Sequence, residues 1–245
     1  MVYFEYLEKV KEMLTRAAKE QQQVIEDVIA LLDHTFSNGG VLHVFGASHA
    51  GIITEELFYR AGGWIPVNPI FAEGLMLNTK PITKTSALER LHGYAEIVLE
   101  GVDFQPKDVL LVHSVSGRNA LAIDIAMFVK AKNIPVVALT SVAFSSMQPS
   151  RHNSGLRLYE VADIILDNYA EFGDAAIGLP GSDLKVGPTS TVVGTALLQT
   201  IMVEVARRFA ASGKPLPVFV SANVENGEEK NDYWLEKYKG RVNYI

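Results

Sequence analysis

Hydrophobic residues recur at two different periods along the chain. Between residues 3 and 36, apolar side chains return every three or four positions, which predicts one long amphipathic helix that ends at the SNGG stretch of residues 37–40. Beyond it, short continuous apolar runs appear, and these are typical of buried strands. The long helix could pack either on its own domain or on a neighbouring subunit.

From residue 41 onward, predicted strands and helices alternate. The strands cover residues 41–45, 64–69, 109–113, 135–140 and 159–167. The helices cover residues 50–61, 88–100, 120–132 and 191–211. Strands that alternate with helices of this length form right-handed βαβ units. The predicted fold class is therefore α/β, a parallel sheet with helices on both faces.

Three regions follow from this pattern. Residues 1–39 form a helical extension, residues 40–212 form one α/β domain, and residues 213–245 form a C-terminal tail. Four aromatic residues occur in the tail: Tyr233, Trp234, Tyr238 and Tyr244. Aromatic residues in a terminal segment favour docking on the domain or on a neighbouring subunit. The glycine-rich stretch of residues 169–186 is too long for a tight connection, and we interpret it as a lid.

Composition narrows the class of protein. With 245 residues, 48% of them hydrophobic, the chain can bury a core. A formal net charge of −6 argues against a nucleic-acid-binding surface. The absence of cysteine excludes disulfides and thiolate chemistry, and the sequence has neither the pattern of a signal peptide nor a transmembrane run. We therefore expect a cytoplasmic protein with no nucleic-acid and no membrane partner.

Two strand-to-helix turns are rich in small and hydroxyl residues. The first, GASHAG, spans residues 46–51, and the second, SVSGRN, spans residues 114–119. In open parallel sheets, ligands bind at such turns, where the N–H groups of the next helix are free and its dipole is positive. Neither turn matches the dinucleotide fingerprint or the P-loop. Each could be an ordinary helix cap, but the pair together favours an anion-binding site.

These two turns and the GPTST segment of residues 187–191 resemble the sugar isomerase (SIS) domain. The resemblance covers residues 40–209. It is strongest to a SIS family described as phosphosugar or phosphoheptose isomerases, and the run GPTSTVVGTALLQ is similar to arabinose-5-phosphate isomerases. A flavodoxin-like three-layer sandwich is implied. The resemblance also implies that a phosphorylated sugar is bound by residues of the three segments: Ser48, His49, Ser114, Ser116, Gly117, Arg118, Asn119, Thr189, Ser190 and Thr191.

The chain departs from these relatives at two places. Heptose isomerases of the superfamily carry a histidine and a glutamate as metal ligands on the helix after the first turn, but residues 50–61 contain no histidine. Arabinose-5-phosphate isomerases carry a lysine in the first turn, where this chain has Ala47. Neither that zinc site nor that particular sugar is therefore expected, and we predict no metal and no cofactor.

Isomerisation of an aldose to a ketose needs a base that moves a proton between adjacent carbons and an acid at the oxygens. Glu89, His92 and Glu96 are three and four residues apart, so they would share one face of the predicted helix. We assign Glu96 as the base and His92 as the acid or polariser, because related isomerases have a His-Gly segment after the second strand. Glu56, on the helix after the first turn, is a further candidate. Each of these side chains could instead lie on a solvated helix face.

A basic loop and two further histidines have no clear assignment to the site. Arg151, His152 and Arg157 occupy a stretch rich in turn-forming residues, where either a phosphate contact or a structural turn is consistent with the pattern. His43 and His113 belong to apolar strands, and we interpret both as buried structural histidines.

The leading hypothesis is an enzyme that binds a phosphorylated sugar and isomerises it through an enediol. A lyase that cleaves a sugar-phosphate ether is an alternative, because it also begins with proton removal beside a carbonyl, and Glu89 and Glu96 could act as its base and acid. A non-catalytic sugar-phosphate sensor is the third, although the N-terminal region lacks a helix-turn-helix pattern. We also expect a homo-oligomer, a dimer or tetramer, as is common in the superfamily.

Overall fold

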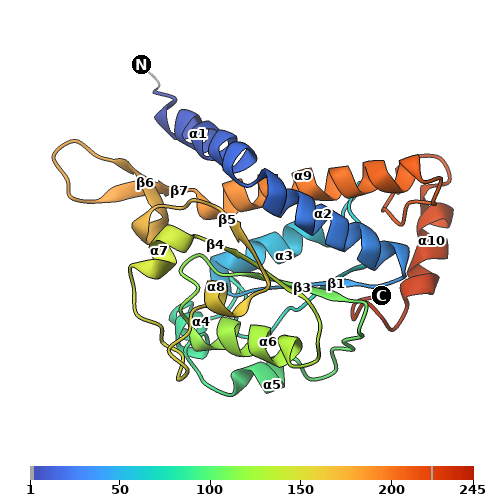
Figure 1. Ribbon diagram of the computed structural model, residues 1–245, viewed down its shortest axis with the longest axis horizontal. Coiled ribbons are helices and arrows are strands. Elements are labelled where there is room, and N and C mark those ends of the chain that lie inside the picture. Colours follow the sequence, from blue (N-terminus) through green and yellow to red (C-terminus); the bar gives the residue numbers. More distant parts are fainter. Residues whose placement is uncertain (1–2, 222) are drawn as a thin grey trace.

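A computed structural model describes residues 3–221 and 223–245 and confirms the α/β fold (Figure 1). Its centre is a five-stranded sheet in the order β2-β1-β3-β4-β5, and every neighbouring pair is parallel. The strands are β1 (Leu42–Gly46), β2 (Val67–Pro69), β3 (Val109–His113), β4 (Val136–Thr140) and β5 (Ile164–Asp167). This is the flavodoxin-like order, in which β1 and β3 mark the point where the strand order reverses.

Helices cover both faces of the sheet and complete three layers (Figure 1). One face carries α2 (Gln22–Ser37), α3 (Ile52–Leu57) and α9 (Ser190–Ala211), and the other carries α5 (Tyr94–Val98), α6 (Ala120–Lys130) and α8 (Leu158–Val161). The other elements are α1 (Glu5–Glu20), η1 (Ser48–Gly51), α4 (Thr83–Leu88), α7 (Val142–Ser146), η2 (Phe172–Asp174), β6 (Ala175–Gly178), β7 (Lys185–Pro188) and α10 (Gly227–Tyr238).

The apolar runs form strands because both faces of the sheet are buried. In β3, Leu111 packs into the core under α2 and α9, whereas Leu110 and Val112 pack into the core under α6. This alternation follows the two-residue period of a strand. No described helix has an apolar stretch of the length that a bilayer requires.

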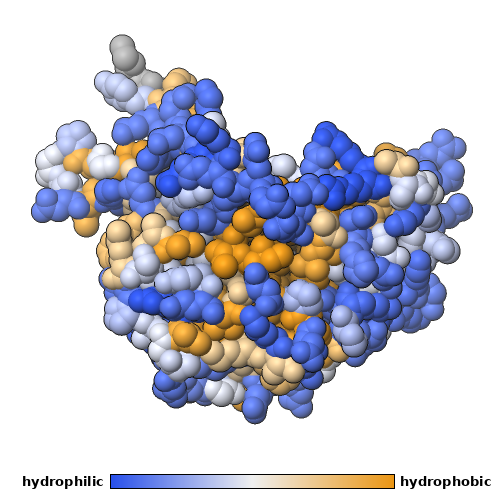
Figure 2. All heavy atoms as spheres, in the orientation of Figure 1, coloured by the Kyte–Doolittle hydropathy of each residue, from blue (hydrophilic) through white to orange (hydrophobic). Residues whose placement is uncertain are grey.

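The N-terminal region contains two helices where one was predicted. α1 ends before Gln21, which is 6% exposed and has the non-helical angles φ −116° and ψ 23°. Its side-chain amide donates to Asp167 O at 2.8 Å and accepts from Asp167 N at 2.7 Å. These bonds hold the break against the end of β5. α2 then packs on the sheet, while α1 packs on α9 through residues such as Met13 and Val193. The outer surface of both helices is mainly hydrophilic (Figure 2).

The single helix predicted for residues 88–100 is wrong. α4 ends at Leu88 and α5 begins at Tyr94, and Gly93 between them has a φ of +77°. That left-handed conformation is open to glycine but unfavourable for other residues. Glu89, His92 and Glu96 therefore do not share a helical face. The strand predicted for residues 159–167 is also shorter, because α8 occupies its first part.

The stretch interpreted as a lid forms an antiparallel hairpin of β6 and β7 instead. The hairpin projects from the body of the molecule next to α1 (Figure 1). The Tyr6 hydroxyl donates to Pro188 O at 2.6 Å and ties the two together. η2, at the base of the hairpin, lies near the carboxyl ends of β1 and β3.

The C-terminal segment packs on the chain's own domain. Trp234 and Tyr238 of α10 are buried in a small core with Val41 and Ile65. Arg241 forms an ion pair with the buried Asp108 carboxylate at 2.7 Å. Further polar groups meet the same carboxylate: burial alone would raise the pKa of Asp108, but hydrogen bonds from His43, Gln105, Arg241 and Val41 lower it below its ordinary value. The structural interpretation of His43 is therefore confirmed.

Candidate functional site

A pocket of about 340 Å³ opens at the carboxyl ends of β1 and β3. Ligands of open parallel sheets bind at this point of strand-order reversal. The lining comes from the two strand-to-helix turns, the end of α4, α7 and η2: Ala47, Ser48, His49, Ala50, Ser86, Glu89, His113, Ser114, Val115, Ser116, Asn119, Ala122, Phe144, Gly173 and Asp174. A larger cavity of about 420 Å³ lies between α10 and residues 59–61, away from the strand ends, so we take the smaller pocket as the candidate site.

The GASHAG turn is built from small residues because the backbone folds back on itself there. A Cβ atom on Gly46 would collide with the backbone of Ala50 and lie 2.9 Å from Gly51 N. Ser48 adopts a positive φ of 52° at the start of η1. The tight turn places the Ser48 side chain at the pocket.

Glu89 supplies a carboxylate that bridges both turns. The Ser48 hydroxyl donates to its Oε1 at 2.9 Å, and the Asn119 amide donates to its Oε2 at 2.8 Å. Arg151 in turn donates to Asn119 Oδ1 at 2.9 Å. The backbone bond from Leu121 N to Glu89 O, 3.1 Å long, fixes the segment after α4 against α6. The carboxylate is thus held in one orientation inside the pocket.

His113 belongs to the pocket lining and has one ring nitrogen that is buried without a partner among the described residues. Its Nδ1 lies 3.0 Å from Ala50 O and must carry the proton, because a carbonyl oxygen only accepts. Nε2 then holds a lone pair, and it has no hydrogen-bond partner among the described residues. Burial lowers the pKa of His113 to about 4, against the opposing effect of the Ala50 hydrogen bond. The residue is buried as predicted, but it offers a free acceptor rather than a satisfied ring.

The Asp174 side chain caps the N-terminus of α9. Its Oδ1 accepts from Thr189 N at 3.2 Å and Ser190 N at 2.9 Å, and its Oδ2 accepts from the Ser190 hydroxyl at 2.5 Å. A carboxylate is stabilised there by free N–H groups and the helix dipole. These bonds hold Asp174 at a φ of +58°, which L residues rarely adopt.

Comparisons with known proteins agree with this architecture. The family model of the SIS domain matches residues 5–141, and a UPF0309 protein from Shouchella clausii is 44% identical over the whole length of both chains. The chain belongs to the SIS domain family. The SIS match includes both N-terminal helices.

Two solved structures share the SIS fold at low sequence identity. A phosphoheptose isomerase from Francisella tularensis is 16% identical with a TM-score of 0.54, over 83% of this chain and 95% of that one. The Vibrio vulnificus NanR protein, complexed with ManNAc-6P, is 13% identical with a TM-score of 0.52, over 95% of this chain and 67% of that one. At these identities the likeness extends to the fold alone.

Half of the residues that the SIS resemblance implies line the pocket: Ser48, His49, Ser114, Ser116 and Asn119. The other half do not: Gly117, Arg118, Thr189, Ser190 and Thr191. Gly117 shapes the second turn with a φ of +54°, since a Cβ there would lie 3.1 Å from both the Thr140 and Ser145 hydroxyls. Arg118 donates to Gln148 and to Pro149 O. Asp174 accepts from the Thr189 N–H and from the Ser190 hydroxyl, whereas the Thr189 hydroxyl is buried without a partner among the described residues.

The three predicted catalytic residues lie outside the pocket lining. Glu96 is exposed on α5, and His92 is exposed in the turn before it. Glu56 is half-buried on α3, where it pairs with Arg60 and accepts from Gln199. Glu89 lines the pocket and Glu96 does not, because the break before Gly93 separates the two residues.

Sequence reasoning missed Ser86 and Asp174 and undervalued Glu89 and His113. The hydroxyl of Ser86 comes from the short helix α4 and the carboxylate of Asp174 from η2, and neither residue belongs to a motif. His113 was detectable in principle, because it is the last residue of a strand that ends at the second turn, and strand ends carry ligand contacts in this kind of sheet.

Proposed function

We propose that the pocket binds a phosphorylated sugar and that Glu89 catalyses its aldose–ketose isomerisation. The observation that carries this proposal is the Glu89 carboxylate itself, held between Ser48 and Asn119 inside a hydroxyl-lined pocket at the sheet's reversal point. Membership of the SIS family and the fold shared with a phosphoheptose isomerase support the same substrate class.

The phosphate of the sugar would lie at the second turn. Ser114 and Ser116 offer hydroxyl donors there, and the N-terminus of α6 adds N–H groups and a positive dipole. Arg151 donates to Asn119, which lines the pocket, and burial together with the positive charges of Arg118 and Arg90 lowers the pKa of Arg151. Their positive charge favours a dianion over a neutral sugar.

The proposed reaction has two steps, and each step transfers one proton at carbon and one at oxygen. Glu89 removes the proton from C2 while His49, which is exposed at the pocket, protonates the carbonyl oxygen on C1, and an enediol forms. The O2 hydroxyl then returns a proton to His49, and Glu89 delivers its proton to C1.

A sugar-phosphate sensor is the second candidate. The NanR protein, which shares the fold, is complexed with ManNAc-6P. In that case the same pocket binds its ligand and Glu89 contacts a hydroxyl group without removing a proton from carbon. The two candidates therefore differ in carbon-bound proton exchange and not in binding.

Binding is tested first with a thermal-shift panel. Aldose phosphates of five, six and seven carbons are compared with the same sugars lacking phosphate. Ligands that bind the folded state raise the melting temperature, so only phosphorylated members should do so. The substitution Ser116→Ala should reduce the shift. Equal shifts from phosphorylated and unphosphorylated sugars would contradict the proposed phosphate site.

Catalysis is tested by deuterium incorporation from D₂O into the sugar phosphate that binds best. Glu89→Gln should slow incorporation roughly a hundredfold or more, because a general base is lost. Glu96→Gln is the matched control, since Glu96 is exposed outside the pocket, and its rate should equal that of the wild type. Binding without any exchange supports the sensor. Loss of exchange in Glu96→Gln alone would return the role of base to Glu96.

A further inference from the structure

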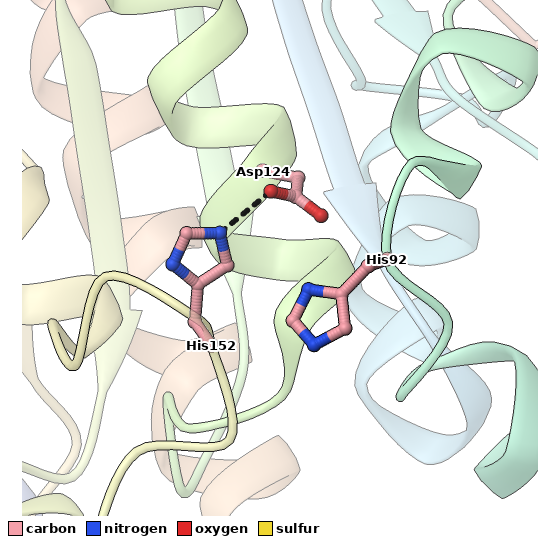
Figure 3. A group of neighbouring side chains, drawn as sticks. All are labelled: His92, Asp124 and His152. Carbon is pink, nitrogen blue, oxygen red and sulfur yellow. Dashed lines mark hydrogen bonds and ion pairs between the residues drawn. The ribbon is translucent and has the colours of Figure 1, made fainter.

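Three side chains with metal-binding chemistry meet beside α6 (Figure 3). His92 comes from the turn after α4, Asp124 from α6, and His152 from the loop between α7 and α8. One ligand atom from each lies within 4.8 Å of the other two. Residues separated by up to 60 positions in the sequence thus converge on one point, and none of the three lines the sugar pocket.

The cluster is only partly satisfied by its own contacts. His152 Nε2 lies 2.7 Å from Asp124 Oδ1, as the dashed line in Figure 3 marks. The second carboxylate oxygen, Asp124 Oδ2, is buried and has no hydrogen-bond partner in the described part of the chain. A buried acceptor left unpaired is costly. The His92 ring lies alongside, with its centroid 5.6 Å from that of His152.

Neighbouring groups fix the orientation of the His152 ring. Its side chain is 10% exposed, and its Nδ1 accepts from Ser154 N at 3.1 Å and lies 2.6 Å from the Ser154 hydroxyl. Because Nδ1 accepts there, Nε2 carries the proton and donates to Asp124 Oδ1. A cation at Nε2 would take the place of that proton, which would shift to Nδ1 and be donated to the Ser154 hydroxyl instead of the bond from Ser154 N. The loop itself is anchored by the bond from Arg151 N to Arg118 O, 2.8 Å long.

Metal binding requires the largest movement from His92, the most exposed side chain of the three. Ligand bonds of about 2.0–2.2 Å in a tetrahedral site separate ligand atoms by roughly 3.4 Å, less than the 4.8 Å limit found here. His92 is exposed and precedes Gly93, so its ring can rotate toward Asp124 without disturbing the core. Asp124 and His152 are already in contact.

We propose that His92, Asp124 and His152 bind one divalent transition-metal ion, best matched by Zn²⁺. Two imidazole nitrogens and one carboxylate form a ligand set that Zn²⁺ favours, whereas Mg²⁺ and Ca²⁺ prefer oxygen ligands alone. Three protein ligands leave a coordination position for water or another molecule. The ion would tie the loop of His152 and the turn of His92 to α6.

The test measures Zn²⁺ binding to chelator-treated full-length protein by isothermal titration calorimetry. The wild type should bind about one ion per chain. His92→Ala and Asp124→Asn should each weaken Zn²⁺ binding about tenfold or more, and Mg²⁺ should give no comparable heat. Replacement of Zn²⁺ by Co²⁺ should produce a visible absorption band in the wild type that is lost in His92→Ala.

Two histidine variants serve as controls. His34→Ala removes an exposed histidine on α2, and His49→Ala removes the exposed histidine of the sugar pocket; both should retain wild-type affinity for Zn²⁺. Because His92 is exposed, His92→Ala is expected to fold normally, which circular dichroism checks. Wild-type affinity in His92→Ala, or loss of binding only in His49→Ala, would overturn the proposal. So would the absence of Zn²⁺ binding by the wild type.

Discussion

His113 makes the stability of the fold depend on pH. Burial keeps its imidazole neutral, with a pKa of about 4, and leaves Nε2 without a hydrogen-bond partner among the described residues at the end of β3. A protonated ring at this position would bury a positive charge and a second N–H donor without a partner, which is unfavourable.

The buried imidazole predicts a specific dependence on pH. Because the folded pKa is about 4 and the unfolded value is 6.5, the unfolded chain binds the proton first as the pH falls. The contribution of His113 to stability is complete above pH 6.5 and is lost as the pH falls toward 4, by roughly 2–3 kcal/mol between pH 7.5 and 4.5. Urea unfolding at the two pH values should reveal this loss in the wild type.

The variant His113→Gln isolates the effect of this one group. It should lose less unfolding free energy than the wild type over the same pH interval, because the carboxylates that also titrate there are common to both proteins. His34→Gln, which alters an exposed histidine, should follow the wild type. An identical pH dependence in wild type and His113→Gln would mean that His113 does not titrate as described.

At the scale of elements, Gln21 explains why two N-terminal helices exist instead of one. Its amide pairs with both backbone groups of Asp167 at the end of the edge strand β5. Gln21→Ala removes these bonds and leaves two strand-end groups unpaired, so we expect a loss of about 1–3 kcal/mol in unfolding free energy. Urea unfolding measures it.

Gln23→Ala is the matched control for this substitution. Gln23 is exposed on the next helix, and its side chain bonds to Asp27 in the same helix, so its removal should change the unfolding free energy by less than about 0.5 kcal/mol. Equal effects of the two substitutions would show that the contact between Gln21 and β5 does not stabilise the fold.

The strands could be predicted from the sequence more accurately than the helices around the site. β3 is recovered residue for residue, because a strand buried on both faces is apolar throughout. The helix predicted for residues 88–100 failed because the apolar spacing suits one helix, while the left-handed Gly93 separates α4 from α5. The spacing of apolar residues does not indicate where the chain changes direction between two helices.

At the scale of the whole molecule, topology accounts for what could be predicted of the site. The turns after β1 and β3 meet because these strands are neighbours in the sheet, so Ser48, Ser114 and Ser116 were predictable from strand order and motif. Glu89 and Asp174 enter the pocket from the end of α4 and from η2. The cluster of His92 and His152 likewise depends on how loops pack on α6, which no local pattern encodes.

The shape of the molecule leads to a last prediction, on assembly. α1 and the β6–β7 hairpin extend beyond the sheet (Figure 1), and they expose apolar side chains, among them Leu7 at 59% and Leu184 at 72%. Apolar side chains on a projecting arm favour burial against a second copy of the chain. Light scattering coupled to size-exclusion chromatography should therefore give the mass of a dimer or a larger homo-oligomer.

Charge placed on the arm should reduce that mass. Leu7→Asp combined with Leu184→Asp would bury two unpaired carboxylates in the interface, so the variant should elute as a monomer or associate at least about tenfold more weakly. Ile97→Asp provides the control, because Ile97 is 65% exposed on α5 at the opposite face of the sheet from α9. A monomeric wild type, or an unchanged mass in the double variant, would exclude the arm as the assembly surface.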